Sequence, residues 1–341
     1  MQSLKLYFPD FICAALITAF SLPVIRKLSA KILKDEPTEV KNHKGVVSTA
    51  GGTALALGFF ASLAGVRFLT DFPSGTLRNL RGLFIGGAII YFLGLADDIK
   101  KPRGLSPGLR LIIQACAAAA LIHYGVYIQF TPQPLGVILT VLWVVGLTNA
   151  FNLIDIMDGL AATQAILAAL AFAVISLPSE YIYVNFAACA LLGAAAGFLP
   201  YNHSKKLKTF LGDSGSTLLG FLLAAVSLGT SYSSHNPLAV YAPLLILAVP
   251  VFNTAFVSVI RISKGISPLK ATPDHFPLRL KTLGLSAAAV VILSAAAAII
   301  FDAAALYITV SGARSSFLIY GLSALFLGTA AFFLARIDHA R

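Results

Sequence analysis

Five aspartates stand in three short polar stretches of an otherwise apolar chain. They are Asp97 and Asp98 in GLADDIKK, Asp155 and Asp158 in NAFNLIDIMDGL, and Asp213 in FLGDSGS. Mg²⁺ prefers oxygen ligands, and it commonly takes one or two protein carboxylates together with the phosphates of a substrate. The lysines beside the first pair would attract the same phosphates. The three stretches therefore predict a divalent-cation site that acts on phosphorylated substrates.

Two of these stretches also allow purely structural explanations. Asp213 precedes an apolar run, and an aspartate that caps the start of a helix stabilises it by ~1 kcal/mol. Asn152, Asp155 and Asp158 lie three apart and would share one side of a helix. Asp158 with Gly159 also resembles the start of a helix. Capping and chemistry both stay open for these residues.

The adjacent pair is harder to explain by structure alone. Asp97 and Asp98 close an apolar stretch that reads as a helix, and two carboxylates are unfavourable at the negative end of the helix macrodipole. Lys100, Lys101 and Arg103 follow and could neutralise them as a solvated charge cluster. The alternative is that the two carboxylates bind a cation such as Mg²⁺.

The elements that must position these residues are membrane-spanning helices. The chain has 341 residues, of which 58% are hydrophobic and 11% charged, whereas an average soluble domain has ~25% charged residues. A spanning helix needs ~20 mostly apolar residues. We expect an all-α, polytopic single domain over residues 1–341 with eleven spans, near residues 7–26, 49–69, 82–96, 108–124, 135–150, 160–177, 181–200, 215–232, 238–260, 285–308 and 316–335.

The basic residues predict the orientation of this domain. The formal net charge of +11 would suggest nucleic acid as a partner of a soluble protein, but lysines and arginines of a membrane protein first report topology. They gather in the joints after residues 26, 96, 200 and 260 and in the C-terminal tail. We therefore expect the N-terminus outside, the C-terminus in the cytoplasm, the aspartates on the cytoplasmic face, and no nucleic-acid partner.

Six segments of the chain resemble, in order, the motifs of the polyprenyl-phosphate N-acetylhexosamine-1-phosphate transferase family. GLADDIKK is similar to its paired-aspartate motif, NLIDIMDGLA to N-x-x-D-G-x-D-G-L-A, and FLGDSGS to F-x-G-D-x-G-S. The others are DEPTEVKNHKGVVSTAGG, LSPGLRLIIQ and PDHF, which resemble D-x-P…K-x-H…G-G, K-L-x-x-Q and the final histidine segment. The resemblance runs through nearly the whole chain.

The chain departs from the family pattern at four positions. Arg110 replaces a usual lysine, Ile156 a common glycine and Asn253 a frequent acid, while Leu278 stands where many members have another histidine. The first segment favours the N-acetylglucosamine branch, and the absence of H-H-H-F-E argues against the muramoyl-pentapeptide branch, which remains the alternative. His275 is otherwise an exposed loop histidine.

The resemblance implies an enzyme that starts a cell-envelope polysaccharide at the inner membrane. Its substrates would be a UDP-N-acetylhexosamine and undecaprenyl phosphate, a membrane lipid, with Mg²⁺ or Mn²⁺ as cofactor and a homodimer by analogy. The residues implied as catalytic are Asp97, Asp98, Asp155, Asp158 and His275; as metal ligands, Asp213 and Asp98; as substrate-binding, Lys44, Lys101, Arg110, Asn152 and Phe210. A covalent aspartyl-phosphate intermediate stays open.

A transporter or lipid flippase is the rival of another class, because carboxylates inside a membrane also mark ion pathways. Such acids lie near the bilayer midplane, often in broken helices. The five aspartates fall instead at the ends of the expected helices. The enzyme is therefore the favoured interpretation.

Overall fold

The computed structural model describes residues 4–36, 45–69, 72–101, 103–179, 182–233, 235–270 and 272–337. Its chain divides into two compact units, Met1–Thr230 and Ser231–Arg341. Both are built from helices, and within the described residues the only sheet is a two-stranded one in the first unit. The all-α class is confirmed, and the organisation as one domain stays a prediction.

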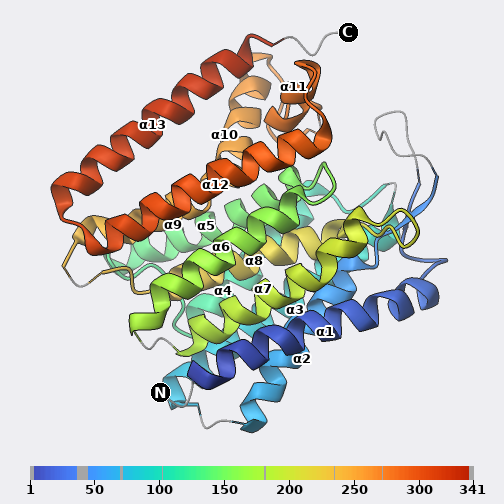
Figure 1. Ribbon diagram of the computed structural model, residues 1–341, viewed down its shortest axis with the longest axis horizontal. Helices are drawn as coiled ribbons and strands as arrows, with labels where there is room; N and C mark the ends of the chain where they lie inside the picture. The colour runs from blue at the N-terminus through green and yellow to red at the C-terminus, as the bar shows by residue number, and fades with distance from the viewer. Residues whose placement is uncertain are drawn as a thin grey trace. The chain divides into compact units, whose positions relative to one another are not determined.

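The first unit is a bundle around a buried central helix, α8. Its elements are α1 (Leu4–Leu28), β1 (Lys34–Asp35), β2 (Val47–Ser48), α2 (Gly51–Leu69), α3 (Ser74–Lys100), α4 (Pro107–His123), α5 (Gln133–Ile154), α6 (Leu160–Ser176), η1 (Leu177–Ser179), α7 (Ile182–His203) and α8 (Gly212–Gly229). α8 packs mainly against α3, α5 and α2, whereas α1 lies along α7 and α2 (Figure 1). α8 is buried along nearly its whole length.

Glycines let α3 and α8 touch backbone to backbone. A Cβ atom on Gly94 would lie 2.5 Å from the Cα atom of Ser214 and 2.6 Å from the carbonyl oxygen of Asp213. Gly212 has a φ of 69°, and a Cβ atom there would lie 2.5 Å from Oδ2 of Asp98. Small residues permit such close approach of helices in membranes. The end of α3 is thereby held directly against the start of α8.

The second unit contains a broken helix. Its elements are η2 (Pro237–Tyr241), α9 (Ala242–Ile246), α10 (Ala248–Ser263), α11 (Phe276–Thr282), α12 (Ala287–Val310) and α13 (Ala313–Ala335). The stretch expected over residues 238–260 falls on a pair of helical segments, and the chain bends by 72° between Pro237–Ile246 and Ala248–Ser263. Pro250 has no N–H to donate to the carbonyl of Ile246 four residues earlier, so the helix restarts there.

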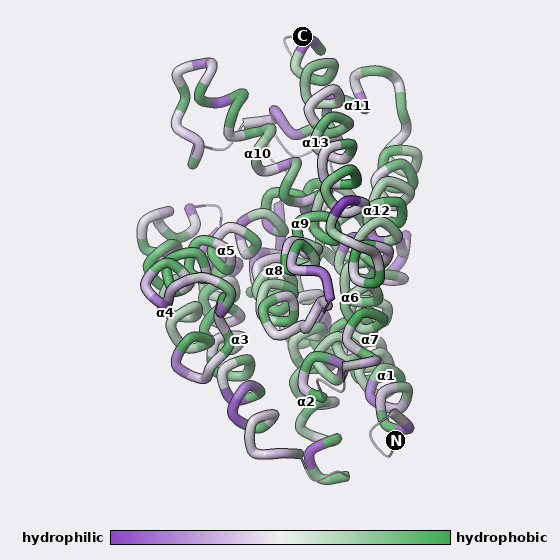
Figure 2. The backbone as a smooth tube through the Cα atoms, turned by 90° about the vertical axis from the view of Figure 1, so that its left-hand side faces the viewer, coloured by the Kyte–Doolittle hydropathy of each residue, from purple (hydrophilic) through white to green (hydrophobic). Residues whose placement is uncertain are grey.

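The helices fit a polytopic membrane protein. Seven helices within the described residues are long and apolar enough to cross a membrane, or eight if the bent pair counts as one span. α4 and α6 are shorter apolar helices. Figure 2 shows that hydrophobic residues predominate along most helices. Each of the eleven expected stretches falls on a helix or on the bent pair, while eleven crossings and the orientation of the termini stay predictions.

Candidate functional site

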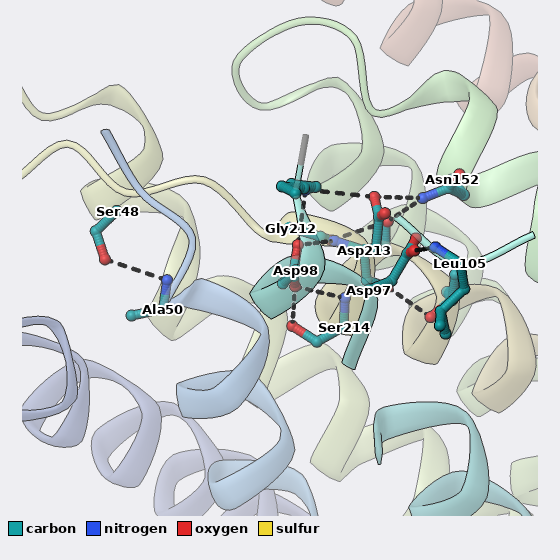
Figure 3. Close-up of polar contacts among 12 residues, drawn as sticks. Ser48, Ala50, Asp97, Asp98, Leu105, Asn152, Gly212, Asp213 and Ser214 are labelled. Carbon is teal, nitrogen blue, oxygen red and sulfur yellow. Dashed lines mark hydrogen bonds and ion pairs between the residues drawn. The ribbon is translucent and has the colours of Figure 1, made fainter. Parts of the chain in front are cut away.

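Asp98 joins the end of α3 to the start of α8. Its Oδ1 atom accepts hydrogen bonds from the backbone N–H of Asp213 at 2.9 Å and from Nζ of Lys101 at 2.7 Å. Its Oδ2 atom accepts from the backbone N–H and the hydroxyl of Ser214 at 2.9 and 2.7 Å (Figure 3). The first N–H groups of a helix lack partners and carry the positive end of its dipole. α8 therefore stabilises a carboxylate that the end of α3 alone would disfavour.

Asp213 lies in the first turn of α8 but does not cap it. Its Oδ2 atom lies 2.9 Å from Nη2 of Arg110, and its Oδ1 atom accepts a hydrogen bond from Nδ2 of Asn152 at 3.1 Å. Nζ of Lys101 lies 3.6 Å from the same Oδ1 atom. The side chain of Asp213 is 21% exposed, whereas that of Asp98 is 0% exposed. Of these two carboxylates, Asp213 is thus the one that a ligand from solvent can reach.

Arg110 links Asp213 to Asp97. Its Nη2 atom also contacts Oδ2 of Asp97, and Oδ1 of Asp97 accepts a hydrogen bond from the backbone N–H of Leu105 at 2.5 Å. Gly104, with a φ of 62°, makes the turn that brings this backbone to the carboxylate. A guanidinium presents several donors in one plane. Arginine at this position can therefore hold two carboxylates at once.

The helical spacing expected for Asn152, Asp155 and Asp158 is wrong. α5 ends before Asp155, which takes the C-cap position with φ −77° and ψ 57°, and Gly159 turns the chain into α6 with a φ of 79°. Only Asn152 remains helical, and its amide contacts α8. Gly159, in the left-handed region, is the N-cap of α6, and its N–H donates to Oδ1 of Asn202 at 2.5 Å. A contact with a residue distant in sequence therefore holds the turn between the two helices, and periodic spacing does not contain it.

Asp158 and Phe210 are brought together by Lys208. Nζ of Lys208 lies 2.5 Å from Oδ2 of Asp158 and 5.6 Å from the centre of the Phe210 ring. The backbone of Phe210 donates to the carbonyl of Ser48 at 2.8 Å and accepts from the N–H of Gly51 at 3.1 Å. Asp158, implied as catalytic, and Phe210, implied as substrate-binding, thus share one lysine that the sequence interpretation did not assign to the site.

A polar recess lies between these helix ends. It encloses about 240 Å³, counted with the solvent space at its mouth. Its lining residues are Leu93, Gly94, Asp97, Arg110, Gln114, Asn149, Asn152, Asp213 and Thr217. The lining therefore brings together four of the implied site residues, one each from α3, α4, α5 and α8: Asp97, Arg110, Asn152 and Asp213.

Two further residues implied by the resemblance, His275 and Lys44, are not among the residues that line the recess. His275 belongs to the second unit, where it is only 7% exposed and its Nδ1 atom lies 3.3 Å from Nδ2 of Asn253. The alternative of an exposed loop histidine is therefore wrong. Lys44 lies outside the described residues.

Comparison of the sequence with known proteins identifies the family of this chain. The sequence model of glycosyl transferase family 4 matches residues 80–231, which contain all five aspartates. The probable undecaprenyl-phosphate N-acetylglucosaminyl 1-phosphate transferase of Bacillus subtilis is 31% identical over 297 residues, 83% of this chain and 79% of its own. The chain belongs to glycosyl transferase family 4.

Other relatives in family 4 carry similar names. The decaprenyl-phosphate N-acetylglucosaminephosphotransferase of Mycobacterium tuberculosis H37Rv is 29% identical over 314 residues, 82% of this chain and 77% of its own. The undecaprenyl-phosphate alpha-N-acetylglucosaminyl 1-phosphate transferase of Escherichia coli K12 is 27% identical over 303 residues, 83% and 79% of the two chains. The resemblance to the N-acetylglucosamine branch is confirmed.

The carboxylates of this family 4 protein fit Mg²⁺ only together with a substrate. No three histidine, cysteine, aspartate or glutamate side chains gather around one point in the part of the chain that the structure describes. Both oxygens of Asp98, implied as a ligand, are occupied by four hydrogen bonds. Asp213 is partly exposed, and Mg²⁺ is often bound by one or two carboxylates plus phosphate oxygens. The donor set therefore suits a metal that the substrate's phosphates help to hold.

Asp155 is a further carboxyl group that interacts with Asp213, and we expect it to destabilise the metal-free protein at high pH. Burial raises the pKa of Asp155 to about 7 from 3.8, Asp213 adds to the rise, and Lys101 opposes it. A folded-state pKa above the unfolded value means that stability falls as pH increases from about 4 to 7 and stays low above. Asp155→Asn removes this cost.

The measurement is thermal unfolding in detergent with EDTA at pH 5 and pH 8. We expect Asp155→Asn to stabilise the protein on the order of 1 kcal/mol more at pH 8 than at pH 5, since one unit of pKa shift corresponds to ~1.4 kcal/mol. Glu36→Gln, at an exposed carboxylate, should behave alike at both pH values. An equal gain for Asp155→Asn at both pH values would contradict the assignment.

Sequence interpretation missed several residues that shape the site. The hydroxyl of Ser214 donates to Asp98, and that of Ser216 accepts from Asn152 at 3.0 Å. Asn149 donates to Oε1 of Gln114 at 2.7 Å, which ties α5 to α4 beside the recess. The serines stand in FLGDSGS itself, so their nearness to Asp213 was the available signal. Asn149 and Gln114 stand in NAFNLIDIMDGL and LSPGLRLIIQ, but nothing in these two stretches indicates that their side chains pair.

Proposed function

We propose that this protein transfers N-acetylglucosamine-1-phosphate from UDP-N-acetylglucosamine to undecaprenyl phosphate. The products are UMP and a polyprenyl-pyrophosphoryl sugar that begins a cell-envelope polysaccharide. The names of the relatives support the reaction. The observation that carries it is the position of Asp213, a partly exposed carboxylate in ion-pair or hydrogen-bond contact with Arg110, Lys101 and Asn152.

Charge is the main obstacle to this reaction. The donor pyrophosphate carries two negative charges, and a phosphate monoester carries up to two because its second pKa is ~6. Arg110 lines the recess, and a guanidinium is always charged in proteins. Lys101, which reaches Asp213, also keeps its charge: burial lowers its pKa, but Asp213 and Asp98 together raise it more. Asp213, with Asp155 nearby, would hold Mg²⁺, which would supply charge neutralisation and polarisation of the phosphoryl oxygens.

The reaction is a displacement at the β-phosphorus of the donor. An oxygen of the lipid phosphate forms a bond to this phosphorus, and the bond from the phosphorus to the bridging oxygen of the pyrophosphate breaks. The bridging oxygen leaves with UMP. Positioning and charge stabilisation are the main contributions a protein makes to phosphoryl transfer. The oxygens of Asp97 and Asp98 are engaged with the protein, which favours direct attack over an aspartyl-phosphate.

The proposed roles follow the contacts. Asp97 positions Arg110, and Asp98 positions the first turn of α8. Asn152 orients Asp213. On the nucleotide side we place Asp158 and Phe210 with the lysine that contacts them. Lys44 and His275 are proposed as further contacts of the donor phosphates and sugar.

The cellular setting is part of the same proposal. The positive-inside distribution of lysines and arginines supports eleven crossings with the N-terminus outside and the C-terminus in the cytoplasm. The site would then face the cytoplasm at the inner membrane, where UDP-sugars are available. A homodimer is proposed by analogy with relatives.

Release of UMP from a panel of donors tests the function. Purified protein is incubated with undecaprenyl phosphate and Mg²⁺ and, separately, with UDP-N-acetylglucosamine, UDP-N-acetylgalactosamine or UDP-N-acetylmuramoyl-pentapeptide. We expect UDP-N-acetylglucosamine to give a kcat/KM at least tenfold above each other donor, because a hydroxyl that a site is built to bind discriminates strongly. Preference for another donor would contradict the sugar assignment, and no UMP with any donor would contradict the reaction.

A further inference from the structure

Two uncharged amide side chains pair with each other in the wall of the recess. Nδ2 of Asn149 in α5 donates to Oε1 of Gln114 in α4 at 2.7 Å, and Nε2 of Gln114 donates to Oδ1 of Asn149 at 3.4 Å. Gln114 is only 1% exposed. A buried amide is costly unless its donors and acceptors find partners. The pair meets this need, yet neither residue has a role in the reaction as proposed.

The amide group of Asn149 is fixed in orientation. Both of its hydrogens are used, because Nδ2 also donates to the carbonyl of Val145 at 2.8 Å, one turn earlier in α5. A side-chain amide has two N–H donors and one carbonyl acceptor. Its oxygen is therefore left to face Nε2 of Gln114. A contact made in both directions resists sliding of α4 along α5.

Each member of the amide pair stands about one helical turn from a residue that contacts Asp213. Gln114 follows Arg110 by four residues on α4. Asn149 precedes Asn152 by three residues on α5. Side chains three or four apart share one face of a helix, and all of these residues line the recess. The amide pair and the contacts of Asp213 therefore form two successive layers on the same faces of α4 and α5.

The layer at the helix ends contacts the carboxylate of Asp213 from two helices. α4 supplies Arg110, whose Nη2 atom lies 2.9 Å from Oδ2 of Asp213. α5 supplies Asn152, whose Nδ2 atom donates to Oδ1 of Asp213 at 3.1 Å (Figure 3). Each carboxylate oxygen thus has a partner from a different helix. A shift of α4 along α5 would move one partner relative to the other and would turn or release the carboxylate.

We infer that the amide pair of Gln114 and Asn149 fixes α4 against α5 and so positions Arg110 and Asn152 on the two oxygens of Asp213. This inference rests on the proposed function, in which Asp213 faces the phosphates and would hold Mg²⁺. Gln114 and Asn149 are positioning residues in it, because they act through Arg110 and Asn152 and not on the substrate. The pair thereby sets the orientation of the carboxylate on which the proposed reaction depends.

Breaking the amide pair should lower turnover without abolishing it. Nη2 of Arg110 also contacts Asp97, and Nδ2 of Asn152 also donates to Oγ of Ser216 at 3.0 Å. Both residues therefore keep a second partner when the pair is broken. A misplacement of about 1 Å at a reacting centre can reduce turnover as much as 10²-fold. We expect this value to be the upper limit of the loss.

Point variants separate positioning from general stability. We expect Gln114→Met and Asn149→Leu each to reduce kcat about 10- to 100-fold. Both should also raise the Mg²⁺ concentration that gives half-maximal turnover, because the carboxylate of Asp213 is no longer held in place. Turnover is measured below the unfolding temperature of each variant. Gln133→Met, at an exposed glutamine in the first turn of α5, should match the parent. An unchanged kcat in both variants of the pair would overturn the inference.

Combined variants test whether the amide pair acts as one unit and through Asn152. Gln114→Met together with Asn149→Leu should lower kcat little beyond either single change, because both changes break the same contact. In an Asn152→Ala background, Asn149→Leu should lower kcat by a smaller factor than in the parent, since one of the positioned contacts is already absent. Losses that multiply in either combination would contradict the inference.

Hydrogen exchange measures the effect of the amide pair without substrate or metal. We expect the last turn of α5, residues 150–154, to be protected in the parent. This protection should fall about tenfold in Gln114→Met and Asn149→Leu, because the turn opens locally more often, but not in Gln133→Met. If the parent releases no UMP while exchange follows this pattern, the proposed function fails and the link between α4 and α5 stands. If UMP is released but neither exchange nor kcat changes in the variants, the inference fails alone.

Discussion

Asp213→Asn will reduce UMP release by about 10³-fold or more at saturating Mg²⁺, with little change in the thermal unfolding temperature. Asparagine keeps the shape and one acceptor oxygen but loses the negative charge that faces Arg110 and Lys101. Loss of one preorganised electrostatic contact at a reacting centre costs 10²–10³ in kcat, and here the proposed ligand of Mg²⁺ is lost as well. The fold depends little on this side chain, because it is 21% exposed and its backbone, not its carboxylate, bonds to Asp98.

The matched control is Glu36→Gln, which neutralises an exposed carboxylate paired only with Lys34 among the described residues. We expect its turnover to equal that of the parent. A tenfold higher Mg²⁺ concentration should not restore the turnover of Asp213→Asn if the carboxylate is a direct ligand. It should restore turnover if the carboxylate only raises the local concentration of cations. Turnover within tenfold of the parent would show that Asp213 does not hold the metal.

Asp98→Ala will destabilise the protein by roughly 3–5 kcal/mol, the usual cost of removing one partner of a buried ion pair. It leaves the N–H groups of Asp213 and Ser214 and the ammonium of Lys101 without the acceptor that they share. Asp98→Asn should destabilise the protein nearly as much. The NH₂ group of asparagine can only donate, and it would face N–H and O–H groups that also donate. Ser214→Ala removes one of the four hydrogen bonds and should cost about 1 kcal/mol.

The measurement is unfolding of the detergent-purified variants without Mg²⁺ or substrate, so that loss of metal binding cannot contribute. Glu36→Gln again serves as the control. Activity of Asp98 variants should fall in proportion to the folded fraction and recover at lower temperature. Parental stability together with lost activity would return Asp98 to the role of a metal ligand.

The sequence predicted the elements well and their ends less well. Long apolar runs gave the positions of α1 to α8, because length and composition suffice to define a helix in a membrane. The spacing of Asn152, Asp155 and Asp158 suggested one helical face, yet α5 ends before Asp155. The turn is made by Gly159 and by contacts of residues distant in sequence, which a periodic pattern does not contain. The bend before Pro250 was readable from the proline but was not inferred.

For the site, the sequence identified functional residues but not the contacts that each of them makes. Motif resemblance named Asp97, Asp98 and Asp213 as functional, and all three lie within one small region of α3 and α8. Their division of labour could not be predicted, because it depends on which carboxylate meets the N–H groups of α8 and which faces the recess. Adjacent aspartates in sequence differ here in partner and in exposure. Arg110, a departure from the family pattern, proves to bridge two of the three.

The most direct test follows the β-phosphate of the donor into the lipid. UDP-N-acetylglucosamine labelled separately with ³²P at the β-phosphate and with ¹⁴C in the sugar is incubated with the protein, Mg²⁺ and undecaprenyl phosphate, and the lipid is extracted. Transfer of the sugar phosphate predicts that both labels enter the lipid in equal amounts, matched by UMP, and that neither does so with Asp213→Asn. Sugar label in the lipid without the β-phosphate, with release of UDP, would contradict the account.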